Sequence, residues 1–389
     1  MEHPQDDAGS SGPLAGLLVA DFSRILAGPY ATMLLADLGA EVVKVEGPAG
    51  DDTRTWKPPV RDDRSTYFLG INRNKRSVAL NLKDEGDLEL GRELARRADV
   101  LIENMRPGGM ARFGLDYDTV RATNASIVYA SISGFGTSDE GAKLAGYDLM
   151  VQGMAGLMSL TGSPDGPGYR AGISVFDVMA GMHATIGILA ALKRREADGE
   201  GQHVEVNLMS SALSGLVNQT SAAVAGGVTP FRMGNSHPSL FPYEPLPTAD
   251  GEIIVIAGNN GQFRGLCEVL GIPEVADDER FQSNDARTAR RDELRPLLVE
   301  ALAHGTSDEW FQRFRDRGLP GGPVYTVPEG IAFAEEIGLE PVVEVGEGGA
   351  AIPAVRNPIT LSRTPADYRY PPPELDEHGA DIRAWLGES

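Results

Sequence analysis

The first part of the chain places a strand, a turn, a helix and a second strand in close succession. The apolar stretch Gly16–Phe22 predicts a buried strand, and Glu41–Glu46, which reads EVVKVE, predicts the next one. Between them, Pro29 suits the first turn of a helix that continues through Leu38 and stops at Gly39. Two strands joined by a helix over about 30 residues form a βαβ unit, and this unit requires parallel pairing.

Strand and helix patterns keep alternating to about residue 210, which predicts an α/β doubly wound domain. No G-x-G-x-x-G follows the first strand, so the dinucleotide-binding signature is missing. Gly/Pro-rich stretches then interrupt the chain twice. We therefore expect a disordered leader over 1–13, a large domain over 14–225, a linker over 226–247, a small α/β domain over 248–323 and a return segment over 324–389 that completes the large domain.

Charge and composition exclude several classes of partner. The formal charge of −21 argues against nucleic acid, because phosphate binding needs a basic face. The one cysteine, Cys267, fits a reducing, cytoplasmic location. The six histidines show no metal-ligand spacing, so we expect no metal. In the sequence, no apolar run is expected to be both long enough and uncharged enough to span a membrane, and we expect no membrane partner.

The run Ala171–Arg195 contains one carboxylate, Asp177, at the start of a helix that is apolar on most faces. Such a helix is typical of a buried core. The position of Asp177 fits a residue that caps free backbone N–H groups. It also fits a carboxylate nucleophile, and position alone does not choose between the two. His183, inside the same helix, is interpreted as a core histidine.

Basic residues gather near the ends of the predicted strands, the edge at which open α/β sheets bind ligands. Taken singly, each of these residues is interpreted as a solvated charge in a loop. Together they suggest a phosphate-binding rim along this edge of the sheet. The group comprises Arg24, Arg73, Lys75, Arg76, Arg106 and Arg112. Farther along, Gly258-Asn259-Asn260-Gly261 separates a strand from a helix and reads either as a tight turn or as a mobile lid.

Five blocks in this order resemble the class III coenzyme A transferases, the CaiB/BaiF family, over nearly the whole chain. The blocks are DFSRILAGPYATMLLADLGAEVVKVE (Asp21–Glu46), NRNKRSVALNL (Asn72–Leu82), ADVLIENMRPG (Ala98–Gly108), GYDLMVQGMAGLMSLTG (Gly146–Gly162) and FDVMAGMHATIGILAAL (Phe176–Leu192). The resemblance implies a Rossmann-like large domain with an inserted smaller domain, and an interlocked homodimer. It also implies that the substrates are acyl-CoA and small organic acids.

The family's catalytic aspartate falls on Asp177, whose carboxylate would attack an acyl-CoA thioester and form an aspartyl anhydride. The family's glycine loop falls on Gly258, Asn259, Asn260 and Gly261 and would exclude water from that intermediate. A family arginine on the adenine side of CoA is replaced by Gly47, and Arg73, Lys75 or Arg106 is expected to compensate. The other expected CoA-contacting residues are Arg24, Ile25, Ala27, Leu80, Lys83, Asn104, Arg112 and Tyr147.

Two alternatives stand beside the transferase. α-Methylacyl-CoA racemases share the fold but have a histidine where Tyr147 stands and a glutamate near Asn260, so this chain lacks the expected acid–base pair. A CoA-binding protein without turnover is the other alternative. The sequence does not specify the acyl donor or the acceptor acid. Succinyl-CoA is a frequent donor in the family, and the acceptors are small carboxylic or dicarboxylic acids.

Overall fold

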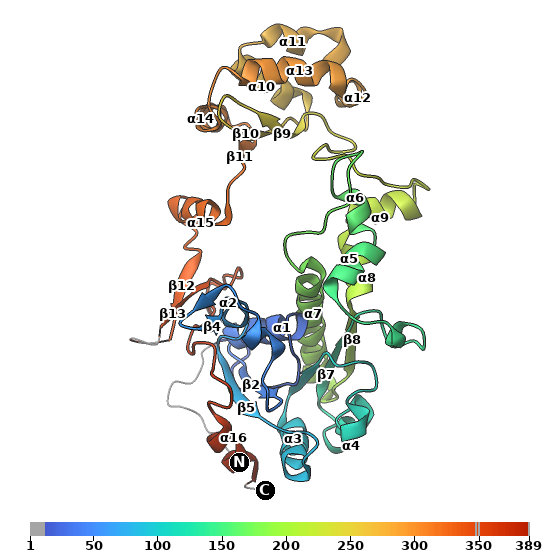
Figure 1. Cartoon of the computed structure of the whole chain (residues 1–389), viewed down its shortest axis with the longest axis vertical. Helices are drawn as coiled ribbons and strands as arrows, with labels where there is room; N and C mark the ends of the chain where they lie inside the picture. The colour runs from blue at the N-terminus through green and yellow to red at the C-terminus, as the bar shows by residue number, and fades with distance from the viewer. Residues whose placement is uncertain (1–11, 347, 349–350, 388–389) are drawn as a thin grey trace. The chain divides into compact units, whose positions relative to one another are not determined.

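The computed structural model describes residues 12–346, 348 and 351–387. The chain divides into two compact units (Figure 1). Unit 1 comprises 1–157, 171–228 and 340–389, and unit 2 comprises 158–170 and 229–339. The sequence-based limits place 158–170 and 324–339 in the large domain, whereas both segments belong to unit 2, and the leader expected over 1–13 lies almost wholly outside the described residues.

Unit 1 is built on a six-stranded sheet in the order β5-β2-β1-β6-β7-β8, in which every pair is parallel. The strands are β1 (Leu18–Asp21), β2 (Glu41–Glu46), β5 (Lys75–Ala79), β6 (Val100–Glu103), β7 (Val128–Ser133) and β8 (His203–Asn207). The chain adds strands on one side of β1 and then on the other, so the order reverses between β1 and β6. The doubly wound parallel fold predicted from the βαβ pattern is therefore confirmed.

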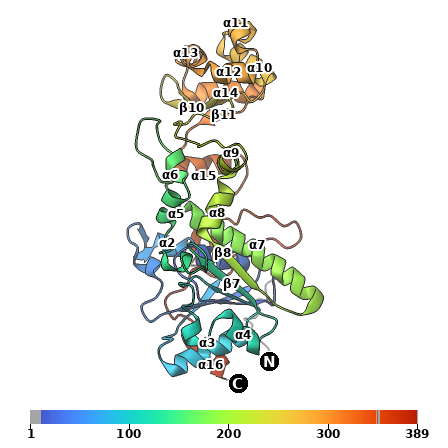
Figure 2. The same cartoon turned by 90° about the vertical axis from the view of Figure 1, so that its right-hand side faces the viewer.

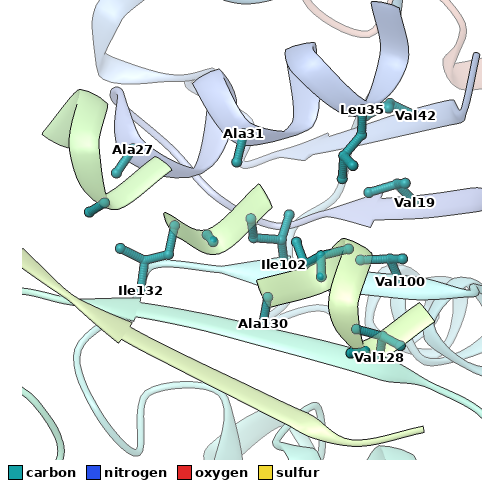
Figure 3. Close-up of a cluster of buried hydrophobic side chains, with 14 of the residues drawn as sticks. Val19, Ala27, Ala31, Leu35, Val42, Val100, Ile102, Val128, Ala130 and Ile132 are labelled. Atoms are coloured by element: carbon teal, nitrogen blue, oxygen red, sulfur yellow. The ribbon is translucent and has the colours of Figure 1, made fainter. Parts of the chain in front are cut away.

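Helices cover both faces of this sheet, because alternate strand residues are apolar on both faces. On one face, Val19, Val100 and Val128 pack against the helices α1 and α7, and Figure 3 shows side chains of α1 facing these strands. On the other face, Ala20 and Leu101 pack against α3, α4 and α16, which Figure 2 shows on the side of β7 away from α7. These helices are α1 (Ala27–Asp37), α3 (Glu85–Arg97), α4 (Tyr117–Thr123), α7 (Val175–Asp198) and α16 (Gly379–Gly387).

Shorter elements complete unit 1. They are η1 (Asp52–Thr55), β3 (Val60–Arg61), β4 (Arg64–Ser65), α2 (Thr66–Leu69), η2 (Ala111–Phe113), η3 (Gly141–Lys143), α5 (Asp148–Met154), α8 (Leu208–Gly215), α9 (Val217–Val224), β12 (Val342–Val345) and β13 (Ile352–Val355). The helix α6 (Leu157–Leu160) lies at the division between the units. The last segment joins the sheet through side chains: Asn357 donates to Asp37 over 3.0 Å, and Asn74 donates to the Asp367 carbonyl over 2.7 Å.

The long helix α7 is less buried in this chain than its composition predicts. Ala180, Ala184 and Ile188 are buried, whereas Met182 and Ile186 are 41% and 64% exposed. By length and composition alone, α7 could also cross a membrane, so the expectation that no apolar run is both long enough and uncharged enough to span one was wrong. The reason is that its charged residues after Asp177 all lie in its last turns. Its buried face packs against α1, β7 and α8, and its exposed face stays apolar.

Unit 2 has its own core beneath an antiparallel sheet of β9 (Tyr243–Pro247), β10 (Glu252–Ile256) and β11 (Gly321–Pro323), with β10 in the centre. Ile253, Val255 and Phe263 lie in this core with Leu298 and Phe314. The helices of unit 2 are α10 (Asn260–Leu270), α11 (Pro273–Asp277), η4 (Glu279–Phe281), α12 (Asn284–Ala289), α13 (Arg291–Leu302), α14 (Ser307–Arg317) and α15 (Val327–Glu336).

Candidate active site

A cleft of about 520 Å³ opens in unit 1 where β1, β6 and β7 end. This is the carboxyl edge of the sheet at the point where strand order reverses, the place where α/β folds bind ligands. The cleft is large enough for much of a cofactor-sized ligand. Its expected residues are Arg24, Ile25, Ala27, Asn104, Arg106, Arg112, Tyr147 and Asp177, and residues that the sequence analysis did not select include Trp56, Tyr67, Asp148 and Ser174.

Two glycine contacts bring the walls of this cleft together. A Cβ atom at Gly134, after β7, would lie 2.3 Å from the Cα of Gly146, so the segment that carries Tyr147 touches the end of β7 only because both residues are glycine. A Cβ atom at Gly181 would lie 2.6 Å from the carbonyl oxygen of Ala27. Gly181 follows Asp177 by one helical turn, so this contact holds the start of α7 beside the start of α1.

The first turn of α7 is capped by another element. Asp148, at the start of α5, accepts hydrogen bonds through Oδ1 from the backbone N–H groups of Phe176 at 2.8 Å and Asp177 at 3.2 Å. Gln152 donates to the other carboxylate oxygen of Asp148 and to the carbonyl of Ile173. The capping role that the sequence left open for Asp177 is thus performed by Asp148, which leaves the Asp177 carboxylate for another function.

The Asp177 carboxylate accepts no hydrogen bond from any residue of the described part of the chain, although the residue is largely buried, with intermediate exposure to solvent. Burial, and then the negative charge of nearby Asp148, raise the pKa of Asp177 to about 7. Burial, and then the negative charge of Asp177, raise the pKa of Tyr67, whose hydroxyl faces Ser174. A desolvated carboxylate without hydrogen-bond donors in a cleft is a more basic and more reactive nucleophile than a solvated one.

Positive charge also lines this cleft. Arg106 and Arg112 are exposed, and neither forms an ion pair within the described part of the chain. Arg112 lies over the ring of Phe113 at 4.5 Å. Arg24 forms an exposed pair with Asp52 at 3.1 Å, and such a pair exchanges easily for another anion. The cleft therefore combines a desolvated carboxylate with guanidinium groups suited to a phosphorylated ligand.

Four of the expected CoA-contacting residues lie elsewhere. Arg73 is buried in a pair with Asp37 at 2.6 Å, and Lys75 is buried against Asp21 at 3.2 Å. Leu80 belongs to the apolar core, and Lys83 is exposed in the loop before α3. None of these four residues lines the cleft. Arg73 and Lys75 are instead paired with buried carboxylates of unit 1.

The expected glycine loop lies in unit 2, at the start of α10. Asn259 caps that helix by accepting from the Gln262 N–H at 2.9 Å, and Asn260 accepts from Arg287 at 3.1 Å. The tight-turn interpretation describes this local geometry. The function of Gly258–Gly261 as a lid stays a prediction.

Comparison with known proteins gives the same family over nearly the whole chain. A family model described as CoA-transferase family III matches residues 14–379. A succinate–glutarate CoA-transferase from Agrobacterium fabrum is 42% identical, and the match covers 96% of each chain. An acetyl-CoA:oxalate CoA-transferase from Acetobacter aceti is 40% identical over 96% of this chain and 95% of its own length. The crystal structure of a CAIB/BAIF family protein from Brucella suis, 41% identical, superimposes with a TM-score of 0.87 over 97% of this chain and 100% of its own.

Proposed function

Because this chain belongs to CoA-transferase family III, we propose that it moves coenzyme A from succinyl-CoA or a similar acyl-CoA to a small dicarboxylic acid through covalent catalysis by Asp177. Family membership itself makes the protein a CoA-transferase with acyl-CoA and organic acid substrates. The observation that carries the proposal for Asp177 is its position in the cleft, where the carboxylate is desolvated and has no hydrogen-bond donor among the residues that the structure describes.

In the proposed reaction, an Asp177 oxygen attacks the carbonyl carbon of the thioester, the C–S bond breaks and CoA leaves as a thiolate. The thiolate then attacks the aspartyl carbonyl of the mixed anhydride, which releases the donor acid and gives an aspartyl-CoA thioester. The acceptor carboxylate reverses both steps. Every step exchanges one acyl–oxygen or acyl–sulfur bond for another, so no metal or redox partner is required. Proximity in the cleft compensates for the weak nucleophilicity of a carboxylate.

We expect a dicarboxylic acid as acceptor, because relatives at 42% and 40% identity carry succinate, glutarate and oxalate in their names. The measurement is transfer from succinyl-CoA and acetyl-CoA to a panel of monocarboxylic and dicarboxylic acids, followed by mass. The expected result is a kcat/KM at least about tenfold higher for one C2–C5 dicarboxylic acid than for the monocarboxylic acid of equal length. Equal rates across the panel would contradict the dicarboxylate assignment. Deuterium wash-in at the α-carbon of a 2-methylacyl-CoA, without transfer, would favour the racemase alternative.

We also propose that the protein acts as a homodimer. In the single chain, apolar side chains stay exposed on three successive helices: Met182 and Ile186 on α7, Leu213 on α8, and Val217 and Val224 on α9. Exposed apolar surface of this kind is typical of an interface between subunits. The family resemblance points to a second copy of the chain as its partner.

A charge at the centre of α7 tests the dimer. Ile186→Glu is expected to convert a species of twice 41.4 kDa into a monomer, because an unpaired carboxylate in an apolar interface carries a large desolvation cost. Light scattering after gel filtration measures the mass. Lys193→Glu, which places the same charge on the polar end of the same helix, is the control and should leave the mass unchanged. A dimer in both variants would exclude this face of α7 from the interface.

A further inference from the structure

The turn between β1 and α1 contains a strained residue on the wall of the cleft. Ile25 has φ +69°, in the left-handed region that a β-branched side chain rarely adopts. A residue in this conformation is strained and persists only where its surroundings fix it. Ile25 and its neighbour Arg24 both line the cleft. The groups that hold this turn therefore influence the shape of the site.

Asn104 holds one side of the turn. Its Oδ1 accepts from the Arg24 N–H at 2.9 Å, and its Nδ2 donates to the Arg24 carbonyl at 2.7 Å. The side-chain amide thereby pairs with both backbone groups of one residue, as a neighbouring strand would. This use of the amide differs from the direct CoA contact that the family resemblance implied for Asn104.

Asp51 holds the other side. Its two carboxylate oxygens lie 3.3 and 3.2 Å from the N–H of Ile25, the strained residue itself. Lys44 donates to Asp51 at 3.0 Å and to the Ser23 carbonyl at 3.2 Å, and both charged side chains are fully buried. Thr53 donates to Asp51 through its N–H and its hydroxyl. A buried ion pair contributes little net stability, but in some proteins it specifies one conformation.

We infer that Asp51 and Asn104 are positioning residues for the acyl-CoA substrate, which keep the Arg24–Ile25 turn left-handed so that it forms the wall of the cleft containing Asp177. The inference rests on the proposed function for the identity of the ligand. If Ile25 relaxed to a negative φ, the chain direction would change between β1 and α1. Arg24 and Ala27 would then move relative to Asp177, and substrate binding would weaken.

A double-mutant cycle separates positioning from general stability. Asp51→Asn keeps an oxygen near Ile25 but removes the charge that pairs with Lys44. We expect it to raise the KM for the acyl-CoA donor about tenfold and to change kcat less than about threefold. In an Ile25→Gly background, the same substitution should raise KM less than about threefold, because glycine adopts φ +69° without strain. Equal losses in both backgrounds, or a loss confined to kcat, would overturn the inference.

Two further variants serve as the substitute and the control for this double-mutant cycle. If Asp51→Asn does not fold, Asn104→Ala, a change at a partly exposed residue, takes its place. Asn104→Ala is expected to raise KM with isoleucine at position 25 and to raise it much less with glycine there. Asp84→Asn is the matched control, since Asp84 also accepts backbone N–H groups, of Gly86 and Asp87, but lies outside the cleft. It should lower thermal stability and leave KM unchanged; a KM increase equal to that of Asp51→Asn would overturn the inference.

Equilibrium binding of free CoA, measured by calorimetry, distinguishes this inference from the proposed function because it requires no chemistry. A tenfold weaker Kd in Asp51→Asn that largely recovers with Ile25→Gly supports positioning, even if Asp177 proves dispensable for transfer. Unchanged CoA binding in Asp51→Asn and Asn104→Ala overturns positioning and leaves the function of Asp177 intact. Absence of CoA binding by the unaltered protein overturns both.

Discussion

Asp177→Asn is expected to reduce CoA transfer at least about a thousandfold, because asparagine has no carboxylate to form the anhydride. The variant should fold, since the backbone N–H groups at the start of α7 are capped by Asp148 and the Asp177 carboxylate accepts no hydrogen bond within the described residues. Initial rates with succinyl-CoA and the best acceptor measure the effect. Asp139→Asn, an exposed change in unit 1 outside the cleft, is the control and should retain full activity.

The same variant should gain stability in a pH-dependent way. Burial raises the pKa of Asp177 to about 7 from an ordinary value of 3.8, so folding penalises the charged form. At pH 4 and below, both the folded and unfolded states hold the proton, and the substitution changes little. The gain grows as pH rises through the range from 4 to 7 and is complete above it, at about 1–3 kcal/mol after a discount for partial exposure. A melting temperature raised at pH 8 and unchanged at pH 4 is the expected pattern.

Trapping identifies the covalent step directly. Hydroxylamine added during turnover should convert the activated Asp177 to a hydroxamate, which mass spectrometry detects on the peptide that contains the start of α7. The label should require the acyl-CoA donor and should be absent in Asp177→Asn. Full activity of Asp177→Asn, or unlabelled peptide from a protein that is turning over, would contradict nucleophilic catalysis by this residue.

The fold of unit 1 was predictable because the same local pattern, an apolar strand followed by a helix, recurs along the chain. Apolar strands alternating with helices require parallel pairing, and the sheet has the predicted α/β topology. The exposure of Ile186 was not predictable in the same way, because an apolar helix reads as buried whether it packs within its own chain or against a partner. The domain limits near 324–339 depend on which residues α15 contacts, and composition does not carry that information.

The site was partly predictable for a topological reason. Arg24 and Asn104 follow β1 and β6, whose carboxyl ends are adjacent, so both reach the cleft. From the sequence, Arg73 was expected to be as accessible to a ligand as Arg24. In the structure it is buried in an ion pair with Asp37, which lies 36 residues away along the chain. Asp148 went unselected, although a single aspartate at the start of a helix was visible in the sequence. Its relation to Asp177 is a contact across 29 residues that only the fold supplies.

The rate of transfer should fall steeply in mild acid. The Asp177 nucleophile must be ionised, and burial with the charge of Asp148 raises its pKa to about 7. The kcat/KM for the donor reports the pKa of the free enzyme, so it should decrease about tenfold per pH unit below 7, and about a hundredfold between pH 8 and pH 5. An acetyl-CoA donor is preferred for the measurement, because its acyl group has no carboxylate that titrates in this range.

Asp148→Asn tests the cause of this pH dependence. The substitution keeps an oxygen that can accept from the N–H groups of Phe176 and Asp177, but it removes the second contribution to the raised pKa. The acid limb of the profile should therefore move to lower pH. The shift should be partial, because burial is the larger cause and remains. Asp116→Asn, at a carboxylate that caps α4 outside the cleft, is the control and should leave the limb in place. An acid limb that does not move in Asp148→Asn, or that moves equally in both variants, would show that the titrating group is not Asp177 beside Asp148.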